Sequence, residues 1–459
     1  MKRYTLFALV LLPFIICCNK QELLDARSRT SLVIPGTLKD FQAILDNYST
    51  MNVTPYMGEL SADNYFMTTT YWQGRSIPDQ NAYTWQPEIY NGSINVKDWN
   101  EPYIQVLYAN TVLEGLAKLS DQSVAAKQIQ GEALFFRSFA FHNLALVFAP
   151  TYDAATAETD MGIPLRLSAD LNEKVQRASV KDTYERILED LLQAAPLLAG
   201  VDVSNYRNRP GQRAAYALLA RVYLSMRDYA KAGSYADSAL QLDATLINYN
   251  TVSLSSAYYL PFTRLNAETI FQSTMSGFAA IFIQFAGISN QLSIDSTLFR
   301  SYHANDLRRN IFFYQQSNGS INVNGSYAGV GNSFTGLATD ELFLIRAESH
   351  ARAGRVTEAM KDLNMLLRNR YKTNAYTDLT AGSSSDALTK VLTERRKEMP
   401  LRGVRWSDLK RLNKEGANIT LIHIVNNQAY TLSPNSPLYV LPIPPDAVQL
   451  GGLIQNQRP

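Results

Sequence analysis

Two predicted helical hairpins with the same pattern of small and aromatic residues constrain the fold of this chain most strongly. The first is expected at Gln212–Met226 and Tyr229–Leu242, and the second at Thr339–Ala353 and Val356–Arg370. Both follow the spacing of a tetratricopeptide repeat, in which alanines let paired helices approach and larger side chains fill the gaps. The residues at these positions are Tyr216, Leu219, Ala220, Tyr223, Ala232, Ala236 and Ala239, then Phe343, Ala347, His350, Ala359, Leu363 and Leu366. Two unrelated hairpins are the alternative.

Other helices must pack beside these hairpins, because fewer than three repeat units rarely form a stable fold. Apolar residues between Ile129 and Val147 recur at spacings of three and four, which predicts a further helix. Two more are expected at Lys181–Leu198, with Ser179 as N-cap, and at 387–398. The sequence therefore predicts an all-α dominated fold built on tetratricopeptide-like helical hairpins, with long loop insertions and minor β-hairpins.

Two long polar stretches interrupt the helices. Residues 61–95 and 246–337 are rich in polar residues and lack a clear helical period. The Gly-rich part at 318–336 is typical of hairpins or loops. Because segments of this length are usually functional insertions, we expect variable ligand-binding loops in both regions. The C-terminal segment 439–459 is expected to be extended and docked onto the helices.

The N-terminus has the features of a bacterial lipoprotein signal. A short basic start precedes an apolar stretch from Tyr4 to Ile16, which is too short to span a bilayer comfortably. Cys17 and Cys18 follow, and they are the only cysteines of the chain. An ordinary signal peptide with an incidental cysteine is the alternative. The expected organisation is a signal peptide at 1–17, lipidation at Cys18, a tether at 18–35 and one domain at 36–459, attached to the membrane through its lipid alone.

Composition excludes several classes of protein. The 43 Lys and Arg residues nearly balance the 41 Asp and Glu residues, and the net charge of +2 argues against nucleic acid as a partner. Hydrophobic residues make up 46% of the chain, which argues against bulk disorder. With only 2 cysteines the body of the protein can form neither a disulfide framework nor a cysteine metal site.

The sequence contains no convincing catalytic motif. It lacks a phosphate-binding loop and a dinucleotide-binding fingerprint. The four histidines are far apart, and His142 and His350 are expected to pack within helices. Paired carboxylates of a glycosidase could still meet in the fold, so a surface hydrolase is an alternative. We expect a protein that is not an enzyme, with no catalytic residue, no metal site and no cofactor.

Aromatic residues in 61–95 provide the candidate ligand site. The chain has 26 Tyr and 4 Trp, which are preferred where an apolar face meets water or a polar ligand. Sugars present apolar C–H faces and a rim of hydroxyl groups, so flat rings beside amide and charged groups suit them. The candidates are Tyr65, Trp72 and Trp85 for stacking and Asp63, Asn64 and Arg75 for the hydroxyl groups. Alternatively, these aromatics fasten the loop to the helical body.

Seven blocks of sequence follow one another in a specific order. They are Trp99–Ile104 with Ala109-Asn110, Gly131–Arg137, Gly162–Leu165 with Arg177–Val180 and Asp190-Leu191, Ala214–Leu224, Arg346–Glu348 with Leu363-Asn364 and Arg368–Arg370, Glu394–Glu398 with Gly403–Arg411, and Leu441–Pro444 with Gln455-Asn456. The ordered set resembles the RagB/SusD family of outer-membrane nutrient-binding lipoproteins from Bacteroidota. Two departures are Met399–Arg402, where an acidic residue is usual before Gly403, and Gly451-Gly452, where Asn-Pro is common.

This resemblance implies a SusD-like fold and a role in nutrient uptake at the outer membrane. Members of the family bind a glycan or another nutrient and cap a TonB-dependent, SusC-like transporter. The resemblance transfers no ligand residue, because in the family these residues lie in variable loops. The expected function is capture of a glycan for such a transporter. A peptide-binding uptake protein or a tetratricopeptide-type interaction scaffold without a carbohydrate ligand is the alternative.

Charged residues within the apolar helices of these blocks are expected to be structural. A buried charge needs a partner, so they should pair between helices rather than act as catalysts. They are Arg137, Glu348, Arg395, Arg396, Glu398, Arg405 and Asp408. Trp406, in the same block as Arg405 and Asp408, is expected in the core.

Overall fold

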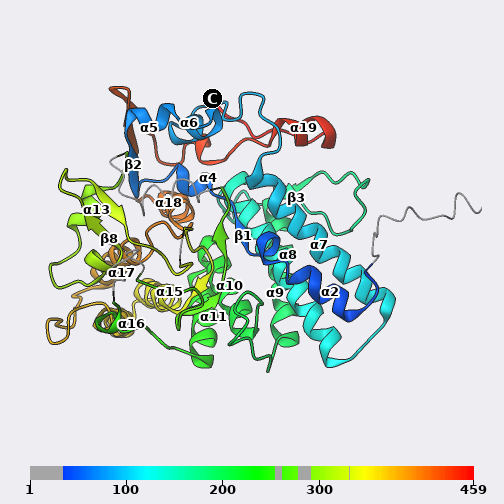
Figure 1. Cartoon of the computed structure of the whole chain (residues 1–459), viewed down its shortest axis with the longest axis horizontal. Coiled ribbons are helices and arrows are strands. Elements are labelled where there is room, and N and C mark those ends of the chain that lie inside the picture. Colours follow the sequence, from blue (N-terminus) through cyan, green and yellow to red (C-terminus); the bar gives the residue numbers. More distant parts are fainter. Residues whose placement is uncertain (1–34, 254–260, 278–290, 330) are drawn as a thin grey trace, which may run out of the picture.

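The computed structural model describes residues 35–253, 261–277, 291–329 and 331–459. Its largest part is a series of helices, α7 to α11 followed by α15 and α16, in which each packs against the next (Figure 1). The prediction of an all-α dominated fold is confirmed. The principal helices are α7 (Lys97–Leu119), α8 (Val124–Phe148), α9 (Val180–Leu197), α10 (Gln212–Ser225), α11 (Tyr229–Leu242), α15 (Thr339–Arg352), α16 (Val356–Arg368), α17 (Ser384–Glu398) and α18 (Arg405–Lys414).

The two repeat-like hairpins, α10–α11 and α15–α16, form where the sequence predicts them. They also pack on each other through α11 and α15. At this contact a Cβ atom on Gly233 would lie 2.2 Å from Oγ of Ser349, so only glycine permits such a close approach. The repeat alanines Ala232, Ala236 and Ala347 are fully buried. The two hairpins therefore belong to one continuous stack rather than to separate units.

The polar stretches 61–95 and 246–337, expected as long loops, contain short helices and strands. In the first stretch β2 (Tyr65–Met67) is followed by α5 (Thr69–Gln73) and α6 (Ile77–Tyr83). β2 pairs with β7 (Leu292–Ile294) of the second stretch, and β1 (Val53–Thr54) pairs with β6 (Thr274–Met275). Other short elements among the described residues of the second stretch are η1 (Tyr249–Thr251), β5 (Thr269–Phe271), α13 (Ser296–Arg300), α14 (Arg308–Ile311), β8 (Phe313–Gln315), β9 (Ile321–Val323) and β10 (Leu337–Ala338).

These strands are only two or three residues long, and most of their partners are distant in the sequence. Such pairings leave no local periodicity, which is why the sequence did not predict them individually. The minor β-hairpins that were expected do occur, for instance as β8–β9 and as β11 (Leu421–Val425) with β12 (Gln428–Leu432). The two insertions are thus joined to each other by strand pairing.

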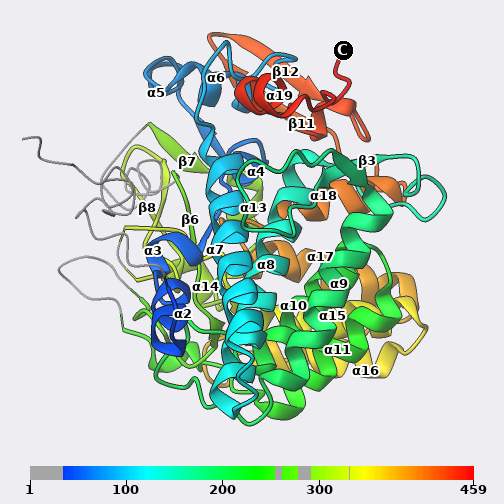
Figure 2. The same ribbon diagram turned by 90° about the vertical axis from the view of Figure 1, so that its right-hand side faces the viewer.

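The C-terminal segment docks onto the body as expected, although it contains a short helix, α19 (Pro445–Gly451). Asn456 Nδ2 donates to the carbonyl oxygens of Phe148 and Leu441, and Arg458 donates to that of Gln86. In both views α5, α6 and α19 lie at one end of the molecule, together with the C-terminus (Figures 1 and 2). This end combines the first insertion with the last residues of the chain.

Within the described ranges, which begin at residue 35, no helix is both long and apolar enough to cross a bilayer. The predicted signal peptide, Cys18 and the tether as far as residue 34 lie outside the described residues. So do residues 254–260, 278–290 and 330 of the second predicted ligand region. The predictions for these segments therefore stay predictions.

Candidate functional site

The candidate site forms on the short helices of the first insertion. Thr68 caps α5 by accepting a hydrogen bond from the Tyr71 N–H, and Ser76 caps α6 by accepting one from the Asp79 N–H. Both caps satisfy backbone donors that a helix start leaves without partners. The amide side chain of Gln80 donates to the carbonyl oxygens of Gln73 and Arg75, which closes the turn between the two helices. The insertion thus has a defined shape despite its polar sequence.

Three of the six candidate residues lie in the interior. Asn64, Tyr65 and Trp85 are 1%, 2% and 4% exposed. Nε1 of Trp85 donates to the Ser61 carbonyl oxygen at 3.0 Å, and the hydroxyl of Tyr65 donates to that of Leu60 at 3.2 Å. Nδ2 of Asn64 donates to Glu59 at 3.2 Å. The three side chains therefore pack inside the insertion and stabilise it, and they are not exposed to a ligand.

The ring of Trp85 belongs to a stack that joins the insertion to the C-terminal hairpin. It lies on His423 of β11 with ring centroids 4.4 Å apart, and Tyr83 covers the same imidazole at 3.9 Å. Nδ1 of His423 lies 2.6 Å from the Tyr83 carbonyl oxygen. Burial lowers the pKa of His423 to about 4, so the imidazole is neutral at physiological pH.

Asp63 connects the insertion to the helical body. Its two carboxylate oxygens accept hydrogen bonds from Nε and Nη2 of Arg405 at 2.7 and 2.8 Å. Arg396 adds a second ion pair at 3.2 Å. Burial opposes ionisation, but the Arg405 guanidinium outweighs it and, with Arg396, lowers the pKa of Asp63 to about 2. The carboxylate is already engaged, which makes Asp63 an anchor between elements.

Trp72 and Arg75 are the two candidates that reach the surface. Both are partly exposed, and Tyr71 lies beside them on α5. Nε1 of Trp72 donates to the Gln80 carbonyl oxygen at 3.0 Å, which fixes the orientation of the indole. Arg75 is paired with Asp79 at 2.7 Å, and its guanidinium lies over the Tyr71 ring at 5.6 Å. We call Tyr71, Trp72 and Arg75 the α5 surface.

Phe66 is an exposed aromatic that is close to these residues in sequence and is not among the six candidates. It is 45% exposed, whereas its neighbours Tyr65 and Met67 are each 2% exposed. Alternate residues of a strand face opposite sides, so the strand β2 itself explains the difference. The burial of these residues alternates along β2, but a pattern of three residues is too short to predict a strand from the sequence.

The prediction that the charged residues of the sequence blocks pair between helices is confirmed for Arg137, Glu348, Arg395 and Asp408, whereas Arg396 and Arg405 pair with Asp63, which lies outside the helices. Arg137 makes a bidentate contact with Asp190 of α9 at 2.7 and 2.8 Å, and Glu348 of α15 makes one with Arg411 of α18 at 2.6 and 2.9 Å. Arg395 of α17 donates to Asp408 of α18 at 2.8 Å. Trp406 is 3% exposed, which confirms its place in the core, and His142 is likewise buried at 1%.

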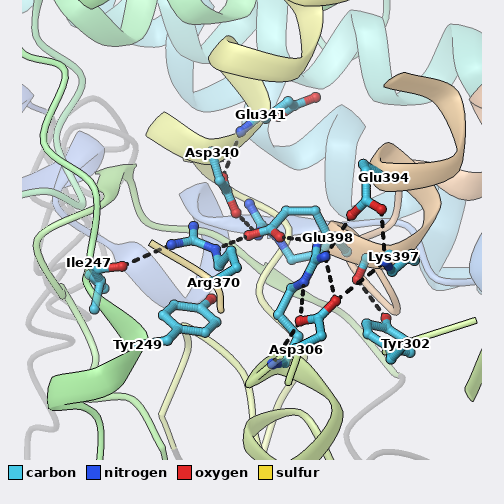
Figure 3. A network of polar contacts seen from close by, with 12 residues as sticks. Ile247, Tyr249, Tyr302, Asp306, Asp340, Glu341, Arg370, Glu394, Lys397 and Glu398 are labelled. Atoms are coloured by element: carbon cyan, nitrogen blue, oxygen red, sulfur yellow. Dashed lines mark hydrogen bonds and ion pairs between the residues drawn. The ribbon is translucent and has the colours of Figure 1, made fainter. Parts of the chain in front are cut away.

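Glu398 lies at the centre of a second buried network (Figure 3). Its carboxylate accepts from Arg370 at 2.7 Å and from Arg308 at 2.8 Å, and these three side chains are completely buried. The other members of the network are Glu268, Tyr302, Asp306, Glu394 and Lys397. They come from the second insertion and from α17. The network therefore fastens that insertion to the helices.

A groove of about 750 Å3 lies along the first half of α7, apart from the candidate residues. Trp99 and Tyr103 contribute to its lining, with the 164–175 loop and α19 on its other sides. Leu171 and Leu450 are 72% and 78% exposed on this groove. Its volume is in the range of ligand-binding clefts. The sequence alone does not predict this groove, because its three sides are far apart in the chain.

Comparison with known families identifies the chain. A family model described as starch-binding and associating with the outer membrane matches residues 22–224, and the SusD family model matches residues 338–458. The chain belongs to the SusD family. Its fold agrees with this, and the resemblance found in the sequence is confirmed.

A curated relative and two solved structures extend the comparison. A SusD-like protein of Formosa agariphila is 23% identical over 53% of this chain, and the matched region spans 47% of that relative's length. A SusD superfamily protein of Bacteroides thetaiotaomicron has a TM-score of 0.73 at 19% identity, covering 92% of this chain and 100% of the other. A SusD-like carbohydrate-binding protein of Bacteroides vulgatus has a TM-score of 0.66 at 18% identity, covering 91% of this chain and 96% of the other. At these identities the structures establish the shared fold.

Proposed function

We propose that this protein is a cell-surface lipoprotein that captures an oligo- or polysaccharide and passes it to a TonB-dependent, SusC-like transporter of the outer membrane. The observation that carries the proposal is the α5 surface, where Trp72 is partly exposed and the neighbouring Tyr71 has the Arg75 guanidinium over its ring, in a chain of the SusD family. The family description of starch binding at the outer membrane supports this choice of ligand and location.

The α5 surface suits a sugar for a simple chemical reason. The ring of Trp72 offers a flat apolar face to the C–H groups of a pyranose, and its own N–H is already occupied by Gln80. Arg75, whose guanidinium lies over the ring of the neighbouring Tyr71, can donate to hydroxyl groups while Asp79 holds its position. This arrangement binds without making or breaking a covalent bond, so the proposal needs no catalytic residue and no cofactor.

The six candidate residues are proposed to divide into two groups. Trp72 and Arg75 contact the ligand. Asp63, Asn64, Tyr65 and Trp85 hold the insertion in the shape that presents those two residues. Substitutions in the second group would then act on folding first and on ligand binding only through it.

Membrane attachment is proposed to occur through a lipid on Cys18, after removal of residues 1–17. The apolar stretch before the two cysteines and the outer-membrane association of the family support this. Cells fed radiolabelled palmitate should label the protein, and Cys18→Ala should abolish the label, whereas Cys17→Ala should retain it. Label that persists in Cys18→Ala would contradict the assignment.

Calorimetric titration of the purified protein with a panel of oligo- and polysaccharides tests the ligand. We expect binding to one glycan class, and a fall in affinity of about tenfold or more in Trp72→Ala, since central aromatic contacts contribute more than ~1 kcal/mol. Tyr206→Ala, at a tyrosine that is 57% exposed outside the insertion, is the matched control and should bind as the wild type does. Equal affinities in Trp72→Ala and the control would exclude the α5 surface.

A peptide ligand is the second candidate, favoured by the groove along α7. Its exposed Leu171 and Leu450 offer apolar contacts to peptide side chains rather than hydroxyl partners to a sugar. A peptide library in the same calorimeter separates the two proposals. Heat from peptides that is lost in Leu171→Asp and unaffected in Trp72→Ala would move the function to this groove. Co-purification with a SusC-like transporter tests the hand-off for either ligand.

A further inference from the structure

A small cavity of about 50 Å3 lies inside the helical body, where α8, α10, α17 and α18 meet. Asn143 of α8, Arg395 of α17 and Ser407 of α18 are among its lining residues, together with Arg402 and Gly403. Measured in this way, a cavity needs about 10–15 Å3 to hold one water. The cavity can therefore hold a single small ion or a few waters, but not a sugar ring.

The cavity is lined by hydrogen-bond donors that have no partner among the described residues. These atoms are Nη1 of Arg395, Nε and Nη2 of Arg402, and Nδ2 of Asn143. The side chains of Arg395 and Arg402 are only 4% and 7% exposed. Leaving such donors unsatisfied in the interior is costly. No buried side-chain oxygen of the described lining residues lacks a partner, so the cavity calls for an acceptor.

Other nitrogen atoms of Arg395 and Arg402 form hydrogen bonds that hold the two guanidinium groups in place. Nε of Arg395 donates to Asp408 at 2.8 Å, and Nη1 of Arg402 donates to Asp340 at 2.9 Å. The guanidinium of Arg402 also contacts the rings of Tyr327 and Phe334, at 5.1 and 4.7 Å from their centroids. The free donors are thus preorganised and cannot turn away to find other partners.

The start of α18 adds a second, independent attraction for negative charge. This helix of 10 residues begins at Arg405, and its N-cap, Val404, provides no side-chain hydrogen bond. Gly403, Val404, Trp406 and Ser407 line the cavity, so the positive end of the helix dipole faces it. Helix starts with free N–H groups bind anions. A cavity, buried unpartnered donors and an uncapped helix start therefore coincide.

The nearby carboxylates do not supply the missing acceptor. Asp408 already accepts from Arg395 and Arg411, both at 2.8 Å. Glu59, the other acidic lining residue, accepts from Asn64 and from the Gly403 N–H at 3.2 and 3.0 Å. A water molecule can accept only two of these hydrogen bonds, whereas an anion accepts hydrogen bonds from every side.

We propose that this cavity binds a small inorganic anion of the size of chloride, held by Arg395, Arg402, Asn143 and the N-terminus of α18. The anion joins α8, α17 and α18 at one point. It is distinct from the ligand site on α5 and serves the cohesion of the helical body.

Bromide, which replaces chloride and scatters anomalously, is the direct probe. Crystals of the protein grown in sodium bromide should show an anomalous peak in the cavity, within hydrogen-bond distance of Nη1 of Arg395. An ordinary water peak without anomalous signal, or an empty cavity, would overturn the proposal.

Thermal unfolding tests it in solution. We expect a melting temperature about 2 °C higher in sodium chloride than in sodium gluconate of equal ionic strength, because only the smaller anion fits and a bound ligand stabilises the folded state. Asn143→Leu should reduce this difference, and Asn100→Leu, on α7 outside the cavity, should retain it. Equal melting temperatures in both salts, or an unchanged difference in Asn143→Leu, would contradict the proposal.

Discussion

Charged and aromatic residues have opposite surroundings in the helical body and on the α5 surface. In the body, Arg308, Arg370 and Glu398 are completely buried, and both arginines form short ion pairs with Glu398. On the α5 surface, Arg75 keeps 20% of its side chain exposed, and Trp72 is also partly exposed. Burial makes pairing obligatory, whereas exposure leaves a side chain free to exchange water for a ligand. The same residue types therefore maintain the fold in one region and are available for binding in the other.

The largest effect is expected from breaking the buried network at Glu398. Glu398→Gln removes the charge that Arg308 and Arg370 share and leaves two buried guanidinium groups without full compensation. We expect the free energy of unfolding to fall by about 3–5 kcal/mol, measured by denaturant titration with circular dichroism. Asp378→Asn, which breaks the exposed pair with Arg368, is the control and should change it by less than about 1 kcal/mol. Similar losses in both variants would remove the distinction between the regions.

Trp85→Ala should be the next most damaging change. The indole is 4% exposed and stacks on His423, so its removal leaves a cavity between the insertion and the C-terminal hairpin. The expected loss in unfolding free energy is about 3 kcal/mol. Trp85→Phe should recover part of it, because a ring can still cover the imidazole. A loss below about 1 kcal/mol would show that the insertion does not depend on this stack.

Asp63→Asn tests the junction between the two regions through its pH dependence. Because the folded pKa of Asp63 is lowered to about 2, its ionised form stabilises the folded state above the unfolded pKa, near 4. That contribution, about 2 kcal/mol at pH 7, is lost as the pH falls from about 4 through 2. Unfolding curves of the wild type and Asp63→Asn should therefore differ at pH 7 and converge at low pH. A constant difference would argue against the ion pair with Arg405.

The smallest effect on stability is expected for Trp72→Ala, although it is the same tryptophan-to-alanine substitution as Trp85→Ala. Trp72 is partly exposed, so truncation should lower the free energy of unfolding by about 1 kcal/mol or less. The same variant should lose ligand affinity, as described above. If Trp72→Ala unfolds as readily as Trp85→Ala, the α5 surface is part of the core and not a binding surface.

The sequence by itself determined the helices and the character of the buried charges. The bounds of α10, α11 and α15 agree with the predicted hairpins because helical periodicity is a local property. Charged residues such as Arg137 and Glu348 within apolar helices had to be paired, and they are.

Only the tertiary structure decided which residues of the first insertion face the solvent. Trp72 and Trp85 lie in the same polar stretch and look equivalent in sequence. Trp85 is buried because β11 brings His423 against it from far along the chain. The cavity at the start of α18 arises in the same way, where Asn143 and Arg395 meet from distant helices. The exposure of a side chain, and the meeting of residues from different helices, depend on contacts between segments that are distant in the sequence. Local sequence patterns do not encode such contacts.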